Sequence, residues 1–161
     1  MYRGSKGFSL IELLIVVAII LIIAAIAIPN LIRSRIAANQ ASAVGSLRTL
    51  NTCEVTYSST FNVGFSATME YLGPGPNSTS NPTSTAAGLI DSILASGSKS
   101  GYTFTYSAGP SDTTGAIETY SFNAQPLSTS TGTNYYYTDQ SGVIRQNSTT
   151  VAESTDSPLA G

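Results

Sequence analysis

The chain has 161 residues, a formal net charge of −2 and only 10% charged residues, well below the share found in ordinary soluble domains. It contains no histidine and a single cysteine, which excludes imidazole chemistry and an intrachain disulfide. The scarcity of basic residues argues against a nucleic-acid partner. The sequence has no nucleophile–histidine pair, glycine-rich phosphate loop or Cys/His cluster, so we expect neither an enzyme nor a bound cofactor or metal.

A short basic leader, residues 1–7, precedes an apolar run from Phe8 to Ile28 that contains no glycine or proline. A helix of this length spans roughly 31 Å, which is enough to cross the hydrocarbon core of a bilayer. Glu12 is the one acidic residue in the run, and a charged carboxylate there costs about 2.5–3.5 kcal/mol on insertion. Glu12 is therefore expected to have a partner. The alternative is a polar residue tolerated near the membrane interface.

Three stretches of this region occur in a fixed order: Gly7-Phe8, then Ser9-Leu10-Ile11-Glu12-Leu13, then Ile28-Pro29-Asn30. Together they resemble the N-terminus of a type IV prepilin or of a type II secretion pseudopilin, over roughly residues 1–57. The resemblance implies cleavage between Gly7 and Phe8 by prepilin peptidase, followed by N-methylation of Phe8. It also implies that Glu12 pairs with the Phe8 ammonium of a neighbouring copy, so that Glu12 and Pro29 serve filament assembly.

The same resemblance supplies a location and partners. It implies a single-pass protein of the inner membrane before assembly, with the leader in the cytoplasm, and a cell-surface pilus or periplasmic pseudopilus afterwards. The implied partners are other copies of the chain, the peptidase and an inner-membrane assembly platform. One rival is ordinary signal cleavage after Ala25-Ile26-Ala27. The apolar run is longer than the usual 7–15-residue core of such signals and carries Glu12, which argues against it.

An amphipathic pattern follows from Asn30 to about Tyr57. Its apolar stripe comprises Ile36, Ala43, Leu47, Leu50 and Tyr57, flanked by Ala37, Val44 and Cys53. We therefore predict one helix from Phe8 to about Tyr57, continuing through Pro29, with Cys53 as a small core residue. The alternative is two separate elements, an anchor and a core helix.

The remainder of the chain predicts a variable loop and then a sheet. Residues 58–86 are rich in turn-forming residues, with a short ordered piece expected around 67–72 and a short helix at 88–94. Alternating patterns predict strands at 102–106, 118–122, 135–138 and 143–145, and Asp139-Gln140-Ser141-Gly142 predicts a hairpin turn. The polar tail, residues 147–161, is expected to be loose.

Two further features favour ordinary explanations over functional ones. Asn77 and Asn147 match the N-glycosylation pattern, which bacterial chains rarely use. Asp139 and Glu118 could share a calcium ion, but lone carboxylates near turns are typical of solvated or capping residues. Within Tyr135–Tyr137, alternation predicts that one or two side chains face the core and the rest are exposed.

These elements predict an α+β fold, in which a long N-terminal helix, transmembrane in its first half, packs on a three- to four-stranded antiparallel sheet. The expected divisions are a leader (1–7), a transmembrane and assembly helix (8–29) and a globular domain (30–161). The favoured function is a structural subunit of a type IV pilus that serves adhesion, motility or a surface fibre. A pseudopilin of a type II secretion system and a DNA-binding minor pilin are the alternatives. The chain lacks the tryptophan and acidic calcium-holding loop that major pseudopilins usually have.

Overall fold

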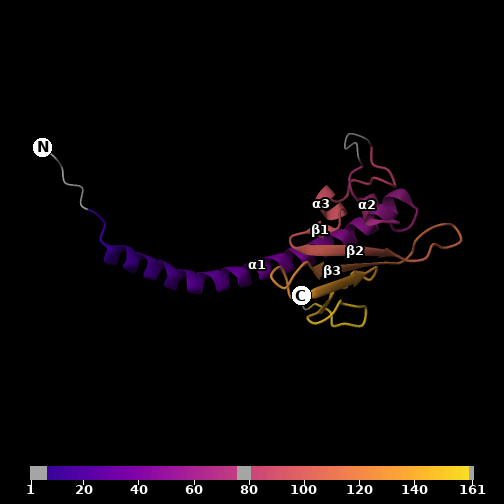
Figure 1. The fold of residues 1–161 in the computed structure, drawn as a ribbon. Helices are drawn as coiled ribbons and strands as arrows, with labels where there is room; N and C mark the ends of the chain where they lie inside the picture. Colours follow the sequence, from indigo (N-terminus) through magenta and orange to yellow (C-terminus); the bar gives the residue numbers. More distant parts are fainter. Residues whose placement is uncertain (1–6, 76–80, 160–161) are drawn as a thin grey trace. The chain divides into compact units, whose positions relative to one another are not determined.

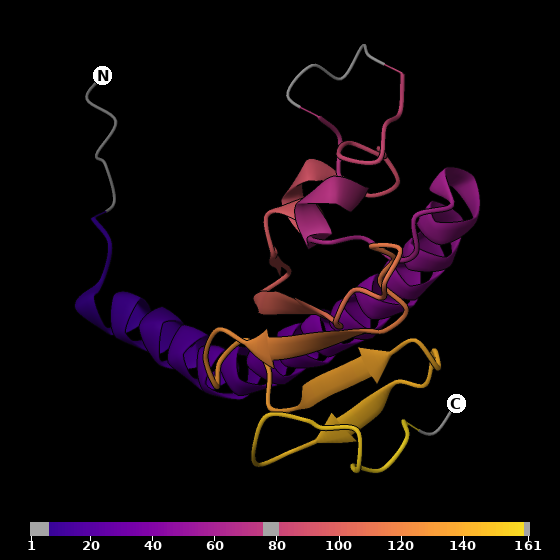
Figure 2. The ribbon, with the colours of Figure 1, turned by 90° about the vertical axis from the view of Figure 1, so that its right-hand side faces the viewer.

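The computed structural model describes residues 7–75 and 81–159, and its ribbon is shown in Figures 1 and 2. The basic leader residues Arg3 and Lys6, and the candidate glycosylation site at Asn77, lie outside the described residues. The chain forms two compact units, an N-terminal unit (Met1–Arg35) and a globular unit (Ile36–Gly161). The expected α+β architecture, with a long N-terminal helix and an antiparallel sheet, is confirmed.

Helix α1 covers Leu10–Phe61, so the prediction of one continuous helix is confirmed, with Pro29 inside it. The helix ends where Asn62 adopts a left-handed conformation, with φ of 55°. The Asn62 N–H donates to the Ser58 carbonyl at 3.0 Å. Asparagine tolerates this conformation better than most residues, and one such residue after the last turn is a common way to terminate a helix.

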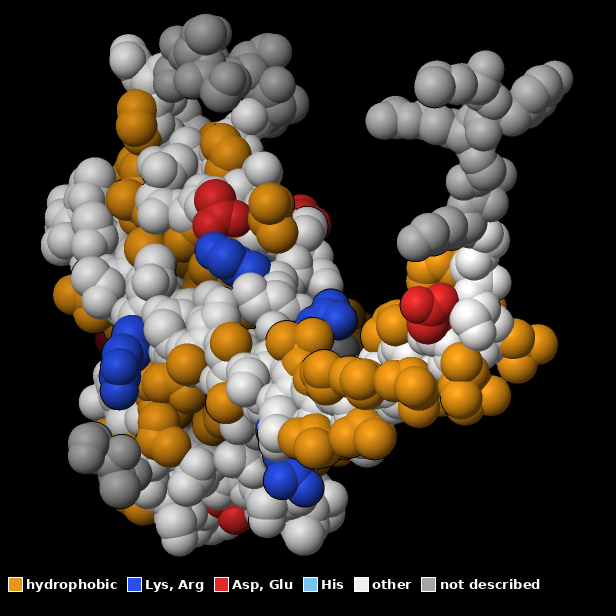
Figure 3. Space-filling view, turned by 90° about the vertical axis from the view of Figure 1, so that its left-hand side faces the viewer, with side chains coloured by type: hydrophobic (Ala, Val, Ile, Leu, Met, Phe, Trp, Pro, Cys, Tyr) orange, Lys and Arg blue, Asp and Glu red, His pale blue; other side chains and the backbone are white. Residues whose placement is uncertain are grey.

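The first part of α1 exposes its apolar side chains. Its most apolar 18-residue window has no buried residue, and this is the one helix among the described residues that is long and apolar enough to cross a membrane. Figure 3 shows hydrophobic side chains gathered along the surface of this part of the helix. Such a continuous apolar surface is unfavourable in water, and it suits lipid or neighbouring helices.

The globular unit contains a meander of five antiparallel strands, ordered β1-β2-β3-β4-β5. The strands are β1 (Ser98–Lys99), β2 (Tyr102–Ala108), β3 (Tyr120–Pro126), β4 (Tyr135–Asp139) and β5 (Arg145–Asn147). The sheet has more strands than the three to four expected. One of the additional strands is β1, which has only two residues, paired with Tyr102 and Thr103. A strand of two residues is too short to produce a recognisable alternation in the sequence.

Alternate residues of the strands pack against α1 in one hydrophobic core. The buried apolar strand residues are Tyr102, Phe104, Tyr120, Phe122, Ala124 and Tyr136. The buried apolar residues of α1 are Ala43, Val44, Leu47, Leu50, Cys53 and Tyr57. The assignment of Cys53 to the core is thus confirmed. Ile36, which was predicted on the stripe, is half-buried. Ala37, which was predicted to flank it, is exposed. At this level α1 faces the loop between β3 and β4 and makes polar contacts there: Asn39 Nδ2 donates to the Thr131 carbonyl at 2.9 Å.

Two short helices precede the sheet, α2 (Met69–Leu72) and α3 (Ser92–Ala95). The helix predicted from residue 88 therefore starts later than expected. Asp91 is its N-cap, with Oδ1 accepting a hydrogen bond from the Leu94 N–H at 2.8 Å. The preceding residues are held by other bonds, since the Leu89 and Ile90 N–H groups both donate to the Leu72 carbonyl.

The expectation of a loose tail is wrong for its described part. Backbone bonds join the Gln146 N–H to the Ser157 carbonyl at 3.0 Å and the Leu159 N–H to the Ile144 carbonyl at 2.8 Å. Asp156 adds side-chain bonds, with its carboxylate accepting from Asn147 Nδ2 and from the Glu153 N–H. Hydrogen bonding and the burial of Ala152 therefore hold the C-terminal segment to the sheet, in a chain that has no disulfide.

Candidate assembly site

The predicted assembly residue Glu12 lies in the first turn of α1. Its Oε2 accepts a hydrogen bond from the Ser9 backbone N–H at 2.9 Å, and the helix starts at the next residue, Leu10. The Ser9 carbonyl in turn accepts from the Leu13 N–H at 3.2 Å. Glu12 therefore satisfies one of the N–H groups that the start of a helix leaves without a partner.

This contact is half of a capping box, in which a glutamate at the third helical position reaches back to the N-cap N–H. The sequence reasoning missed it, although Ser9-Leu10-Ile11-Glu12 has the required Ser-x-x-Glu spacing. The partner expected for Glu12 is thus supplied in part by its own chain. Within the described residues the bond engages Oε2 alone, so Oε1 is available to a second donor.

The predicted cleavage site is accessible. Phe8 is 76% exposed, and a Cβ added at Gly7 would have no other atom within 4 Å. Both residues precede the first helical residue, so cleavage between them would leave α1 and its Ser9–Glu12 bond within the mature chain. Among the residues that the structure describes, no contact therefore requires glycine at position 7.

Pro29, the second predicted assembly residue, stands inside α1 without ending it. Proline has no N–H to donate, so the Ala25 carbonyl, four residues earlier, loses its usual helical partner. One turn later, the Ser34 hydroxyl donates to the Asn30 carbonyl at 3.0 Å. Pro29 and Glu12 both lie in the N-terminal unit but on well-separated turns, so the structure does not bring them together.

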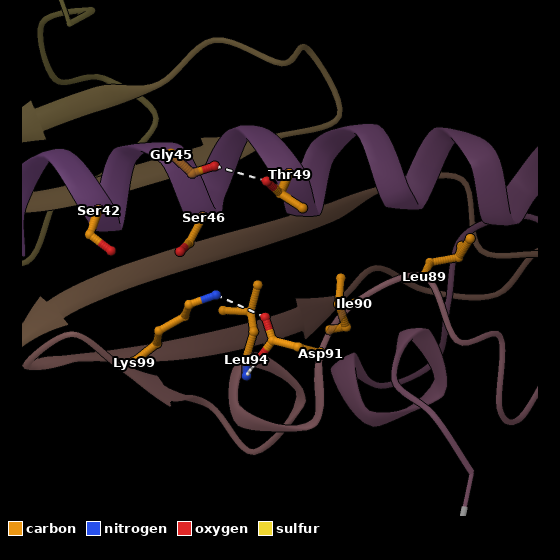
Figure 4. Close-up of a pocket in the computed structure, with 9 residues that line it drawn as sticks. All are labelled: Ser42, Gly45, Ser46, Thr49, Leu89, Ile90, Asp91, Leu94 and Lys99. Atoms are coloured by element: carbon orange, nitrogen blue, oxygen red, sulfur yellow. Dashed lines mark hydrogen bonds and ion pairs between the residues drawn. The ribbon is translucent and has the colours of Figure 1, made fainter. Parts of the chain in front are cut away.

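The globular unit has a groove of about 510 Å³ between α1 and the segment that holds Asp91 and Lys99 (Figure 4). Helix α1 contributes small residues to it, including Ser42, Gly45 and Ser46, and Lys99 and Asp91 lie opposite. Lys99 Nζ lies 2.8 Å from Asp91 Oδ2, and this hydrogen bond is the main cause of the lowered pKa of Asp91. Since Asp91 also caps α3, the ion pair has a structural explanation.

Asp139 and Glu118, the residues considered for calcium, differ in their surroundings. Asp139 Oδ1 accepts from the Ser141 N–H at 2.9 Å within the predicted hairpin turn, whereas Glu118 is an exposed residue outside the strands. Residues 7–75 and 81–159 contain no group of three His, Cys, Asp or Glu side chains that could hold a metal ion. Tyr136 is buried, as the alternation predicted, but Tyr135 and Tyr137 are half-buried rather than exposed.

Comparison with known proteins places the similarity at the N-terminus. Residues 2–28 match the family described as the prokaryotic N-terminal methylation motif. The chain is 65% identical over 37 residues to the type IV wide pilus major component PilA4 of Thermus thermophilus, which covers 23% of this chain and 28% of that protein. It is 49% identical over 53 residues to the type IV major pilin protein PilA of Myxococcus xanthus, which covers 33% of this chain and 24% of that protein.

The aligned region thus spans about a quarter of the length of these curated relatives. No solved structure matches the chain. The methylation motif, the two pilin relatives and the exposed apolar start of α1 agree with one another, and all concern the same end of the molecule. This N-terminal region is therefore similar to the corresponding region of type IV pilins.

Proposed function

We propose that this chain is a structural subunit of a type IV pilus, polymerised through the first part of α1. The observation that carries the proposal is the exposed apolar helix with Glu12 in its first turn, within a segment that matches the methylation motif. Both matched relatives are named as pilus components. A helix of this kind can be held by the bilayer before assembly and by other copies of itself afterwards, since both environments bury apolar surface.

The processing steps form part of the proposal. Prepilin peptidase would cut between Gly7 and Phe8 at the cytoplasmic face of the inner membrane, and the new Phe8 amine would then be methylated. An inner-membrane platform would extract the subunit into a filament on the cell surface. The exposed position of Phe8 and the lack of contacts at Gly7 support this order, because the site can be reached without unfolding α1.

In the filament, Glu12 would pair with the Phe8 ammonium of a neighbouring copy. The capping bond to Ser9 refines this step, since it engages Oε2 and leaves Oε1 for the incoming ammonium. At about 4 Å and an effective dielectric constant near 20, the attraction is on the order of 4 kcal/mol before desolvation is subtracted. That attraction is comparable to the cost of placing the charged carboxylate in the membrane, so the pair favours the assembled state.

Substitution of Glu12 tests the role of its charge separately from its role as a cap. Glu12→Val removes the charge and the capping acceptor, whereas Glu12→Gln keeps an acceptor for the Ser9 N–H but carries no charge. We expect Glu12→Val to be inserted and cleaved yet to assemble very weakly or not at all, and Glu12→Gln to be intermediate. Glu118→Gln is the matched control, because it removes one exposed carboxylate from the globular unit and should leave filament yield unchanged.

Each variant would be expressed in a strain that lacks the native gene. Immunoblots would then compare the subunit in the membrane with the subunit in sheared surface filaments. Normal filament yield from Glu12→Val would rule out a role for Glu12 in assembly. Wild-type yield from Glu12→Gln, with loss of filaments in Glu12→Val, would show that assembly needs the capping bond to Ser9 and not the charge. Deletion of the gene separates the pilin from the pseudopilin alternative, since the first predicts loss of surface fibres and the second loss of secreted enzymes.

A further inference from the structure

A second carboxyl group, Glu54, lies on α1 inside the globular unit and is fully buried. Its Oε2 accepts from the Ser66 N–H at 2.9 Å, and its Oε1 lies 2.6 Å from the Ser66 hydroxyl oxygen. The described residues contain a single ion pair, Lys99–Asp91, so none of them places a cation within 4 Å of Glu54. An ionised carboxylate in such a site is costly, because it is removed from bulk solvent and no described positive charge pairs with it.

Ser66 lies at the end of the segment that leaves α1, which we call loop 62–66. Its carbonyl accepts a hydrogen bond from the Tyr106 hydroxyl of β2. The same loop is fastened at a second point, where the Phe65 N–H donates to the Ile117 carbonyl at 2.7 Å. Gly64 has φ of 80° and lies so close to Ile117 that an added Cβ would be 2.6 Å from its backbone nitrogen. Glu54 thus ties α1 to a loop with a defined conformation.

Burial raises the pKa of Glu54, and hydrogen bonding from the Ser66 hydroxyl, the Ser66 N–H and the Tyr106 hydroxyl offsets only part of this effect. The titratable side chains close enough to interact with it electrostatically are Cys53 and Tyr57 on α1, Tyr106 on β2 and Tyr120 on β3. Burial raises the pKa of each of these four groups as well, so they stay neutral in acidic and neutral solution. Within this cluster, Glu54 therefore changes its charge at a lower pH than the cysteine and the three tyrosines.

We propose that Glu54 and Ser66 form a proton-controlled latch, which fastens loop 62–66 to α1 while Glu54 is protonated and weakens when the proton is lost. A serine hydroxyl can donate or accept, so both contacts can form in either protonation state. In the neutral form Glu54 donates its O–H to the Ser66 hydroxyl and accepts from the Ser66 N–H. Loss of the proton keeps the contacts but places a negative charge in the core, which the hydrogen bonds offset only in part.

The direction of the pH dependence follows from the raised pKa. In the unfolded chain Glu54 titrates near its ordinary value of 4.5, and in the folded chain it titrates at a higher pH. Between the two values the folded state holds a proton that the unfolded state has released, so stability falls as pH rises. The stabilisation by Glu54 is complete below its pKa in the unfolded chain, and it disappears as the pH rises through its pKa in the folded chain.

The test compares the full chain with its Glu54→Gln variant in nonionic detergent, with the melting temperature followed by near-ultraviolet circular dichroism between about pH 4.5 and 8.5. The glutamine keeps the shape and can accept from the Ser66 N–H and donate to its hydroxyl, but it does not titrate. We expect the melting temperature of the wild type to fall relative to that of the variant as pH rises. Parallel curves for the two proteins would overturn the latch.

Infrared titration gives a second readout that does not need the Glu54 variant to fold. It would be carried out in a Glu12→Gln background, which removes the other carboxyl on α1. We expect a protonated-carboxyl band that persists above the ordinary titration range of glutamate, together with declining hydrogen-exchange protection of the Phe65 and Ser66 amides as the band disappears. If all protonated carboxyl groups lose their protons near pH 4.5, so that no band persists at higher pH, the proposal is refuted, whatever the stability of Glu54→Gln.

Discussion

Gly132 lies against the ring of Tyr102, and this contact predicts a large effect from a small substitution. A Cβ at position 132 would lie 2.7 Å from Cζ and 2.8 Å from Cε2 of Tyr102, and closer still to its hydroxyl oxygen. Tyr102 is fully buried and its hydroxyl donates to the Asn134 carbonyl at 2.9 Å, so it has little room to retreat. Gly132→Ala should therefore strain the core and disturb this hydrogen bond.

The magnitude follows from three contributions. Overpacking a core costs about 1–3 kcal/mol, and a lost hydrogen bond costs about 0.5–1.5 kcal/mol. Alanine also restricts the unfolded chain more than glycine does, which stabilises the folded state by about 0.4–1 kcal/mol. We expect the free energy of unfolding to fall by roughly 0.5–4 kcal/mol for Gly132→Ala, on these principles taken together. Gly45→Ala is the control, because a Cβ there has no atom within 4 Å and should stabilise the helix by roughly 0.5–1 kcal/mol.

The assay is thermal and denaturant unfolding of the full chain in detergent. A double-mutant cycle with Tyr102→Phe adds a specific test, because removal of the hydroxyl should cost less in the Gly132→Ala background than in the wild type. An unfolding free energy of Gly132→Ala at or above that of the wild type would refute the packing argument. Strict additivity of the two substitutions would show that the destabilisation arises elsewhere.

Two further predictions concern packing and processing. Leu50 is fully buried between α1 and the sheet, so Leu50→Ala should lower the free energy of unfolding by about 2–5 kcal/mol in denaturant titrations, whereas Val55→Ala on the exposed face of the same helix should stay within about 0.5 kcal/mol. Equal losses for the two would contradict the burial assigned to Leu50. Gly7→Val should leave an uncleaved precursor that is still folded, and intact mass of the wild-type mature protein should show loss of residues 1–7. A mature chain that starts at Ile28 would instead support ordinary signal cleavage.

The sequence was sufficient wherever the information is local. An uninterrupted apolar run determines a membrane-length helix through hydrophobicity and helix propensity alone, and Pro29 did not end it. Alternation between aromatic and polar residues placed β2 correctly, since a strand exposes every second side chain to the core, and the turn signal at 139–142 placed β4. The Ser9–Glu12 cap also belongs to this class, because the two residues are three positions apart, although the motif was overlooked.

The tertiary structure decided what depends on residues distant in the chain. The periodic stripe gave no reason to bury a carboxyl group at Glu54, and only the return of Ser66 to α1 supplies the donors that make its burial tolerable. The tail is ordered because Asn147 and Asp156 meet across a turn, and Ile36 is left half-buried because a polar loop, not the sheet, faces that part of the helix. Hydrogen-bond partners brought together by folding have no periodicity in sequence, so a pattern of hydrophobic residues cannot reveal them.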